Sequence, residues 1–159
     1  MRGKEQSYQN KLNPYYITGF IDGEGSFCVS FGFHKTLSRR VEIRPEFEIE
    51  LRADDSKVLN RIRQAIGCGK VYKLNYERYG WYPHIKLKIS NNKDLTKYLI
   101  PFLDKYPLQA RKAQSYKLFK EVVQMVARKE HLTDAGFKRI TVLRNKMRKL
   151  GKKHFDSNR

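Results

Sequence analysis

Apolar residues recur along this chain at two spacings that alternate in a fixed order. Helical spacing predicts helices over residues 14–24, 53–66, 91–104, 110–129 and 133–150. Alternation of apolar with polar residues predicts strands over 25–35, 41–51, 70–76 and 81–90. The second strand is the most regular, because its odd positions from Val41 to Leu51 are apolar except Pro45, while its even positions are charged. One face of that strand is therefore expected in the core, and the other in solvent or against a ligand.

The order of these elements is helix, hairpin, helix, hairpin and then further helices. It predicts an α+β protein with an αββαββα two-layer fold: a four-stranded antiparallel, saddle-shaped sheet with helices on one face and the other face open. Residues 13–150 are expected to form one domain. Residues 1–12 are expected to be a flexible basic arm, and 151–159 a disordered tail.

Charge narrows the class of partner. The chain has 34 Lys and Arg against 16 Asp and Glu, a net charge of +18, which predicts a polyanionic partner and most simply nucleic acid. An anionic membrane surface is the competing partner, but the sequence has no basic amphipathic anchor or lipidation signal, so no membrane is expected. The sequence also has no apolar run of membrane-spanning length and no signal peptide, and we expect an intracellular protein. Charge alone is equally typical of a ribosomal protein.

Cysteine and histidine contribute little to this picture. Two cysteines are too few for a disulfide framework or a cysteine-based zinc site, and the four histidines lack metal-ligand spacing.

A short stretch near the start of the chain carries the most specific chemistry. Asn13 is a candidate helix cap and Pro14 suits the first helical position. Gly23 and Gly25 flank Glu24, which places this carboxylate at a corner between helix and strand. Gly19 and Gly23 share one helical face that carries no side chain, so another backbone could approach it closely. The same residues are also compatible with an ordinary helix end bearing an exposed glutamate.

The segment Ile17-Thr-Gly-Phe-Ile-Asp-Gly-Glu-Gly25 resembles the motif of the LAGLIDADG homing endonucleases. It departs from that motif at Ile17 and Thr18, where the family has Leu and Ala. Three later stretches are similar to organellar members of the family, so the resemblance covers about residues 13–150: Phe102–Leu108, then Lys112, Tyr116 and Phe119, then Lys129–Thr133.

The resemblance implies a site-specific homing endonuclease that hydrolyses both strands of DNA at a long pseudo-palindromic site and leaves short 3′ overhangs. In the family, two motif helices pack glycine to glycine, and the last acidic residue of each binds a divalent metal. Carried over, Glu24 and the Gly23 carbonyl hold Mg²⁺, which Mn²⁺ or Ca²⁺ can replace. Because the chain has one copy of the motif, the resemblance implies a homodimer made inside an organelle, a mitochondrion or chloroplast. The expected interface residues are Gly19, Gly23, Tyr16 and Asp22.

Two further residues near the corner have expected roles. The family uses a peripheral lysine in catalysis, and Lys112, beside Arg111, fits by position, although a surface cation on a basic helix is the alternative. Asp22 is expected to fix the end of the motif helix by hydrogen bonds rather than to hold metal.

DNA contacts are expected mainly from the open sheet face and the basic turn after the first strand. The candidates are Ser30, His34, Lys35, Arg39, Arg40, Arg44, Glu46, Glu48, Lys70, Tyr72, Lys73, His84, Lys86 and Lys88. Glutamates on this face oppose a polyanion unless lysines neutralise them across strands, or unless some accept from cytosine amino groups. The alternative is an acidic face in ordinary solvent, paired to its lysines. Trp81 and the nearby tyrosines are expected to pack the hairpin rather than stack on bases.

Two other functions remain open at this stage. The same basic surface could bind the host intron RNA, as an RNA maturase that assists splicing without cleavage. A basic structural protein of a ribonucleoprotein would instead be a monomer with no response to metal.

Overall fold

A four-stranded antiparallel sheet forms one layer of the protein, with the strand order β1-β2-β4-β3. Its strands are β1 (Gly25–Phe33), β2 (Val41–Arg52), β3 (Lys70–Leu74) and β4 (His84–Ile89). The structure is a computed structural model and describes residues 11–152. Most of the predicted arm and tail lies outside these residues, but Leu12 packs against the core rather than belonging to a free arm.

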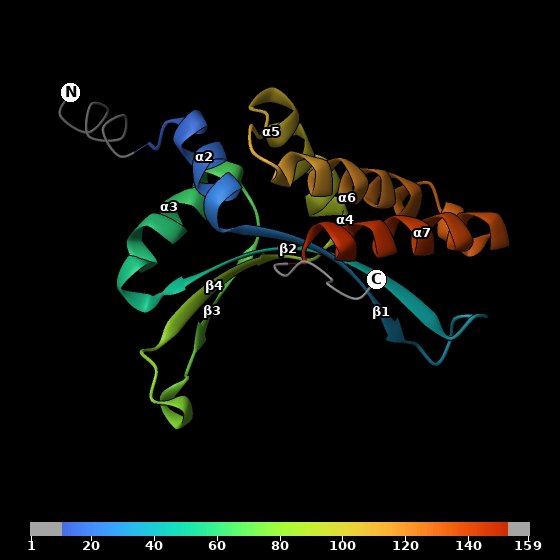
Figure 1. Cartoon of the computed structure of the whole chain (residues 1–159), viewed down its shortest axis with the longest axis horizontal. Coiled ribbons are helices and arrows are strands. Elements are labelled where there is room, and N and C mark those ends of the chain that lie inside the picture. The colour runs from blue at the N-terminus through green and yellow to red at the C-terminus, as the bar shows by residue number, and fades with distance from the viewer. Residues whose placement is uncertain (1–10, 153–159) are drawn as a thin grey trace, which may run out of the picture.

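Helices form the second layer and cover one face of the sheet, as Figure 1 shows. They are α2 (Pro14–Glu24), α3 (Ser56–Ile66), α4 (Asn92–Asp94), α5 (Ile100–Lys105), α6 (Lys112–Ala127) and α7 (Asp134–Leu150). The sheet arches beneath them, and its concave face is uncovered (Figure 1). The predicted α+β fold and the open face are confirmed. None of the helices within residues 11–152 is long and apolar enough to cross a bilayer.

The core lies between the helices and the covered face of the sheet. Phe47 of β2 and Phe119 of α6 are fully buried, and the ring of Phe27 on β1 lies 5.2 Å from the first and 5.1 Å from the second. Burial in β2 alternates, because one face of the strand packs under the helices and the other does not. Pro45 is tolerated in β2 because it pairs only with Val29 of β1, at a point where β4 no longer runs alongside.

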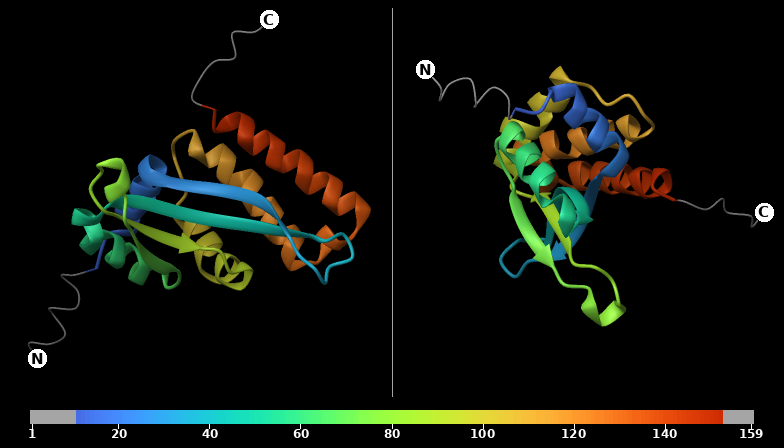
Figure 2. Two further views of the ribbon diagram at one scale, coloured as in Figure 1. Left: turned by 90° about the horizontal axis from the view of Figure 1, so that it is seen from below. Right: turned by 90° about the vertical axis from the view of Figure 1, so that its left-hand side faces the viewer.

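Helix α7 occupies a different position from the other helices. It packs on α6 and on the edge strand β1, and seen from below it lies alongside β1 rather than behind the sheet (Figure 2). Among its basic residues, Arg139 pairs with Glu121 of α6, and the Arg144 guanidinium lies over the Phe31 ring of β1 at 4.2 Å.

Three strand ends differ from the prediction by two residues or more. β1 ends at Phe33 rather than residue 35, because a tight turn follows in which the His34 N–H donates to the Arg40 carbonyl. β3 ends at Leu74 and β4 begins at His84, because residues 75–83 form a loop with a 3₁₀ turn over Glu77–Tyr79. Alternation therefore overestimated the strands on both sides of this loop.

Pro101 lies within a continuous helical run between residues 92 and 105. The segment Leu95–Leu99 is a π-helix, in which the Ile100 N–H donates to the Leu95 carbonyl. The wider turn accommodates the proline, which has no N–H to donate and would crowd the carbonyl of an ordinary helical turn.

Candidate active site

The corner between α2 and β1 is formed by a helix that passes directly into a strand. The Asn13 side chain accepts from the Tyr15 N–H at 2.9 Å and begins the helix. Glu24 is the last helical residue, and Gly25 is already the first residue of β1. A Cβ on Gly25 would lie 2.8 Å from the Ile21 carbonyl oxygen, so the corner requires glycine there. Glu24 is thereby held, exposed, at a fixed point of the backbone.

The two glycines of the motif lie open on α2. Gly19 and Gly23 are exposed, and a Cβ built on either would meet nothing within 4 Å. Tyr16, on the same helix, is 51% exposed. The opposite side of α2 is buried through Ile17 and Ile21. Within residues 11–152, no part of the chain covers the glycine face.

Asp22 ties this corner to the start of α6. Its carboxylate accepts from the Gln109 N–H at 2.8 Å and from the Ala110 N–H at 3.3 Å. The expectation that Asp22 forms structural hydrogen bonds is met, but these bonds hold the segment before α6 rather than the end of α2 itself. A second hydrogen bond also joins α2 to the segment before α6: the Thr18 hydroxyl donates to the Tyr106 carbonyl at 2.8 Å.

Lys112, the first residue of α6, reaches the corner. Its Nζ donates to the Ile21 carbonyl at 3.2 Å. Burial lowers the pKa of Lys112 below the ordinary value for lysine, although the carboxylates of Asp22 and Glu24 act in the opposite direction. Lys112 is therefore partly buried and hydrogen-bonded at the corner.

These elements enclose a cleft of about 530 Å³ between the corner, the start of α6 and the end of α7. Its lining includes Asp22, Gly23, Ser26, Arg111 and Lys112. The residues from 11 to 152 contain no cluster of three or more His, Cys, Asp or Glu that could hold a metal. Glu24 and the Gly23 carbonyl offer oxygen ligands of the kind Mg²⁺ prefers, but they are too few to hold it without further ligands.

The strand register shows which predicted DNA-contact residues share the open face. Across the sheet, Ser30 lies opposite Arg44, Glu48 lies opposite Lys88, and Lys88 lies opposite Lys70. The members of the predicted set that the strands bring onto this one face are Ser30, Arg44, Glu46, Glu48, Lys70, Tyr72, His84, Lys86 and Lys88.

Lys73 does not belong to that face. It pairs with Ile85 and so lies on the side of the sheet that carries the core residues. The register therefore does not bring Lys73 onto the open face with the other strand candidates.

The four candidates after β1 lie in the turn rather than on a strand. They are His34, Lys35, Arg39 and Arg40. Arg39 is engaged on α7, where it pairs with Asp134 and lies over the Phe137 ring at 5.2 Å. Arg40 has a positive φ of 53°.

The sequence profile of the LAGLIDADG endonuclease family matches residues 17–123. The chain belongs to this family. Among relatives, the probable intron-encoded endonuclease 3 of Neurospora crassa is 32% identical over 86% of this chain. The chain spans only 25% of that relative's length.

Solved structures of LAGLIDADG enzymes have the same fold. I-SmaMI bound to uncleaved DNA target in the presence of calcium ions has a TM-score of 0.80 and 31% identity, covering 87% of this chain and 46% of that one. The homing endonuclease I-TnaI has a TM-score of 0.76 and 29% identity, covering 88% of this chain and 96% of that one. The LAGLIDADG helix of the present chain is thus α2.

Carboxylates on the open face of this LAGLIDADG domain are paired. Lys88 Nζ lies 3.2 Å from a Glu46 oxygen and 3.6 Å from a Glu48 oxygen, and Lys86 Nζ lies 3.2 Å from the other Glu48 oxygen. Burial lowers the pKa of Lys88, but the hydrogen bonds and charges of the two glutamates outweigh it, so that the pKa is raised. Neutralisation across strands is therefore present.

Two features of the open face had no signal in the sequence. The Tyr76 hydroxyl, from the β3–β4 loop, donates to Glu50 at 2.6 Å. Burial and the charges of Glu46 and Glu48 raise the pKa of the Cys28 thiol on β1, and the charges of Arg148 and Arg144 on α7 act in the opposite direction. Both features depend on how a segment distant in the sequence folds.

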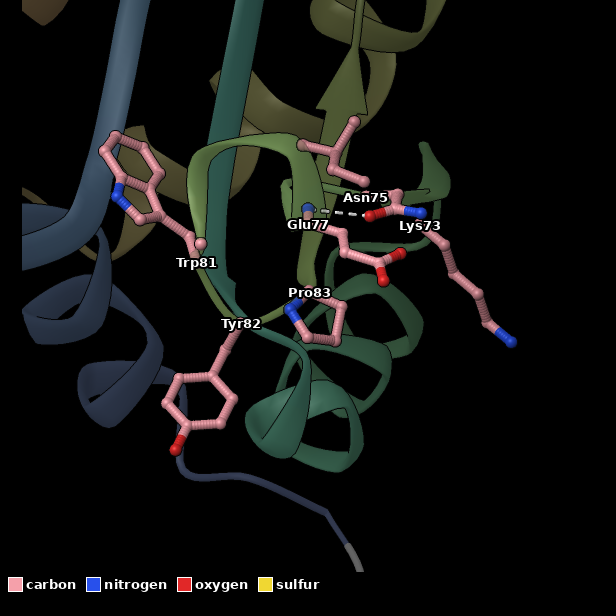
Figure 3. A pocket seen from close by; sticks show the side chains of 8 residues that line it. Lys73, Asn75, Glu77, Trp81, Tyr82 and Pro83 are labelled. Atoms are coloured by element: carbon pink, nitrogen blue, oxygen red, sulfur yellow. Dashed lines mark hydrogen bonds between the residues drawn. The ribbon is translucent and has the colours of Figure 1, made fainter.

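A second hollow lies in the β3–β4 loop, away from the LAGLIDADG corner. It has a volume of about 610 Å³, and the close view shows Trp81 and Tyr82 turned away from Lys73 and Glu77 (Figure 3). The Asn75 side chain accepts from the Glu77 N–H at 2.8 Å and closes the turn. Trp81 contacts the Tyr76 ring edge-on with centroids 5.8 Å apart. Tyr76, Tyr79 and Trp81 thus pack on one another, as expected, although Trp81 stays 61% exposed, whereas Tyr82 lies against Arg52.

Proposed function

We propose that this chain is a homing endonuclease that cuts double-stranded DNA as a homodimer, with a divalent metal at each active site. The observation that carries the proposal is the bare face of Gly19 and Gly23, which lies next to the exposed carboxylate of Glu24. A glycine stripe open to solvent on an ordered helix permits close backbone approach by a second helix of the same kind. A two-fold axis between the two helices brings the two Glu24 carboxylates together, with Tyr16 and Asp22 beside the axis.

Metal binding follows from the same pairing. One chain contributes Glu24 and the Gly23 carbonyl, and the second chain contributes its own copies, which together form an oxygen-rich site. Mg²⁺ is the proposed ion, and Mn²⁺ or Ca²⁺ would fit the same ligands. When bound, the ion neutralises charge on the phosphate and favours deprotonation of an attacking water.

Asp22 and Lys112 have supporting roles at the corner: Asp22 positions Lys112, and Lys112 acts on the attacking water or the phosphate. Asp22 holds the start of α6 against α2 through backbone N–H groups, and this contact keeps Lys112 beside the corner. Lys112 is proposed to take a proton from the attacking water or to hold the scissile phosphate. A lowered pKa suits the first role, because an amine must be neutral to accept a proton.

Target recognition is proposed for the concave sheet face. Two such faces, related by the dimer axis, would follow a long pseudo-palindromic site, with the corners at its centre and cuts that leave short 3′ overhangs. The support is the register that gathers polar residues on this face, and the likeness to I-SmaMI bound to its DNA target. Because relatives are named intron-encoded endonucleases, we propose that this protein is also intron-encoded and made in an organelle. These names do not favour the maturase alternative.

A cleavage assay tests the proposal. The substrate is a plasmid that carries the host gene with its intron-insertion junction, incubated with purified protein in Mg²⁺ or in EDTA. We expect cutting only with Mg²⁺, and Glu24→Gln should cut at least about 100-fold more slowly because a direct metal ligand is lost. Binding of Glu24→Gln to the same DNA in Ca²⁺, measured by gel shift, should change little.

A matched control removes one carboxylate far from the corner. Glu121 on α6 pairs with Arg139 on α7, and Glu121→Gln changes the net charge by the same amount. It should cut as fast as the unmodified protein. Equal cutting by Glu24→Gln and Glu121→Gln would remove Glu24 from the active site.

A further inference from the structure

The open face of the sheet is almost neutral, although the whole chain carries a charge of +18. Its strands bring onto this face the carboxylates Glu42, Glu46, Glu48 and Glu50 and the cations Arg44, Arg52, Lys70, Lys86 and Lys88. Arg52 is further neutralised by Asp54 outside the strand. A face of this composition gives little net attraction to phosphate, so the affinity of the chain for DNA must come from elsewhere.

Four residues at the centre of this face form a continuous row of ion pairs. We call Glu46, Lys88, Glu48 and Lys86 the charge row. Lys88 contacts both glutamates, at 3.2 and 3.6 Å, and Lys86 contacts Glu48 at 3.2 Å. The side chains screen one another, since each of the four is less than 30% exposed. The separate pair of Glu42 and Arg44 is more open, at 41 and 48%.

The two shorter ion pairs of the row, Lys86–Glu48 and Lys88–Glu46, run along diagonals of the sheet, whereas Lys88 and Glu48 lie directly opposite each other. Lys86 lies directly opposite Glu50, yet it contacts Glu48. Glu50 is taken instead by the Tyr76 hydroxyl. Every carboxylate at the centre of the face is thus satisfied before any ligand arrives.

DNA that enters this face must replace those interactions. In the major groove a carboxylate can accept only from an amino group. Cytosine N4 is its usual partner, since adenine N6 lies beside the acceptor N7, and guanine O6 and N7 and thymine O4 are acceptors that repel it. A lysine released from a carboxylate can then bind the guanine of the same or the next base pair. Where the base is wrong, the carboxylate loses water without gaining a donor, and this is unfavourable.

We propose that the charge row is a specificity filter, in which Glu46 and Glu48 select base pairs that present a cytosine amino group and penalise other sequences. This inference rests on the proposed function, since it assigns a role within the DNA surface of the endonuclease. The filter lowers affinity for unselected DNA and in return increases the difference between right and wrong sites.

Selection from a random double-stranded DNA pool in Ca²⁺, followed by affinity measurements, tests the filter. The variants are Glu46→Gln and Glu48→Gln, and Glu121→Gln is the control with the same change of charge. We expect each sheet variant to lose a cytosine preference at its own position in the enriched sequence. The ratio of affinities for the selected and a scrambled duplex should fall about tenfold in each, with tighter binding to the scrambled duplex. Glu121→Gln should leave both the sequence and the ratio unchanged.

The outcomes separate this inference from the proposed function. If the unmodified protein enriches a sequence and the sheet variants enrich the same one with the same ratio, the glutamates are ordinary ion pairs and the filter is wrong. If the unmodified protein enriches no sequence, the proposed function fails and the filter fails with it. Lys88→Gln is expected to have the opposite effect on affinity from the glutamate variants: it should weaken binding to both the selected and the scrambled duplex.

Discussion

The corner at the end of α2 and the charge row on the sheet differ in how completely a single chain supplies contact partners for its own residues. At the corner, Gly19 and Gly23 face solvent with nothing against them, and Glu24 has few companions with which to hold a metal. In the charge row, Glu46 and Glu48 already have lysine partners. In the proposed function the corner is completed by a second chain, whereas in the proposed filter the charge row exchanges its lysine partners for DNA bases. Substitutions should consequently affect the two regions differently: those at the corner in cleavage, those at the row in discrimination.

The largest effect is expected from filling the glycine face. Gly19→Leu should leave the single chain folded, because a side chain there meets nothing within 4 Å and leucine is a better helix former than glycine. It should prevent two α2 helices from meeting, and cleavage should fall by at least about 100-fold. Light scattering should report a change from dimer to monomer.

A control for this prediction adds the same bulk elsewhere. Ala135 is exposed on α7, and Ala135→Leu should retain both the dimer and the activity. A Gly19→Leu protein that still forms dimers and cuts DNA would show that the bare face is not the interface. The corner would then not depend on a second chain in the way proposed.

The next effect concerns Lys112. Because burial lowers its pKa, the neutral amine becomes available at a lower pH than the ordinary value of 10.5. If the neutral amine accepts a proton, the cleavage rate should rise with pH through the range below 10.5 and level off above the pKa of Lys112. Lys112→Gln should lower the rate by roughly 100-fold and abolish this rise.

Lys112→Arg separates two roles of this residue. Arginine keeps the positive charge but does not titrate in the same range, so a phosphate-binding role would be partly rescued and a proton-accepting role would not. An unchanged pH profile in Lys112→Gln would assign the rise to another group.

Features that depend on local sequence patterns could be predicted. Features that depend on contacts between distant segments could not. The alternation of β2 is enough to place Glu46 and Glu48 on the open face, because a strand's period is a local property. Their partners depend on the β2–β4 register, and the diagonal choice of Lys86 could not be read from the sequence. The period of β3 likewise separates Lys73, on the core side, from Lys70 and Tyr72 on the open face.

The same distinction applies at the corner. Asn13, Pro14, Gly23 and Gly25 are local signals, and they place Glu24 at the end of a helix. The bonds from Asp22 to Gln109 and Ala110 join segments more than 80 residues apart, and no local pattern indicates them. The prediction of the fold and of Glu24 thus came from short-range regularity and the motif, whereas the packing around the site required the structure.

A smaller effect, on stability rather than on chemistry, is expected from Asp22. Asp22→Ala leaves the N–H groups of Gln109 and Ala110 without their acceptor, and should lower the free energy of unfolding by about 2 kcal/mol. Thr18→Val removes one neutral hydrogen bond to the same region and should cost about 1 kcal/mol. Urea denaturation of both variants measures the difference, and a loss in Asp22→Ala no greater than in Thr18→Val would mean that the carboxylate is replaceable there.

The smallest effect is expected at the border of the sheet, and it tests where affinity for DNA comes from. Arg148 of α7 is exposed and lies near Cys28 at the edge of the open face. Because the face itself is nearly neutral, α7 is a natural source of phosphate contacts. Arg148→Gln should weaken binding to selected and scrambled duplexes by the same few-fold factor and reduce the salt slope by about 1, since one phosphate contact is lost. This differs in kind from the glutamate variants, which change the ratio between the two duplexes. A change in sequence preference in Arg148→Gln would mean that α7 also takes part in base recognition, and that the division between a neutral reading face and a cationic border is too simple.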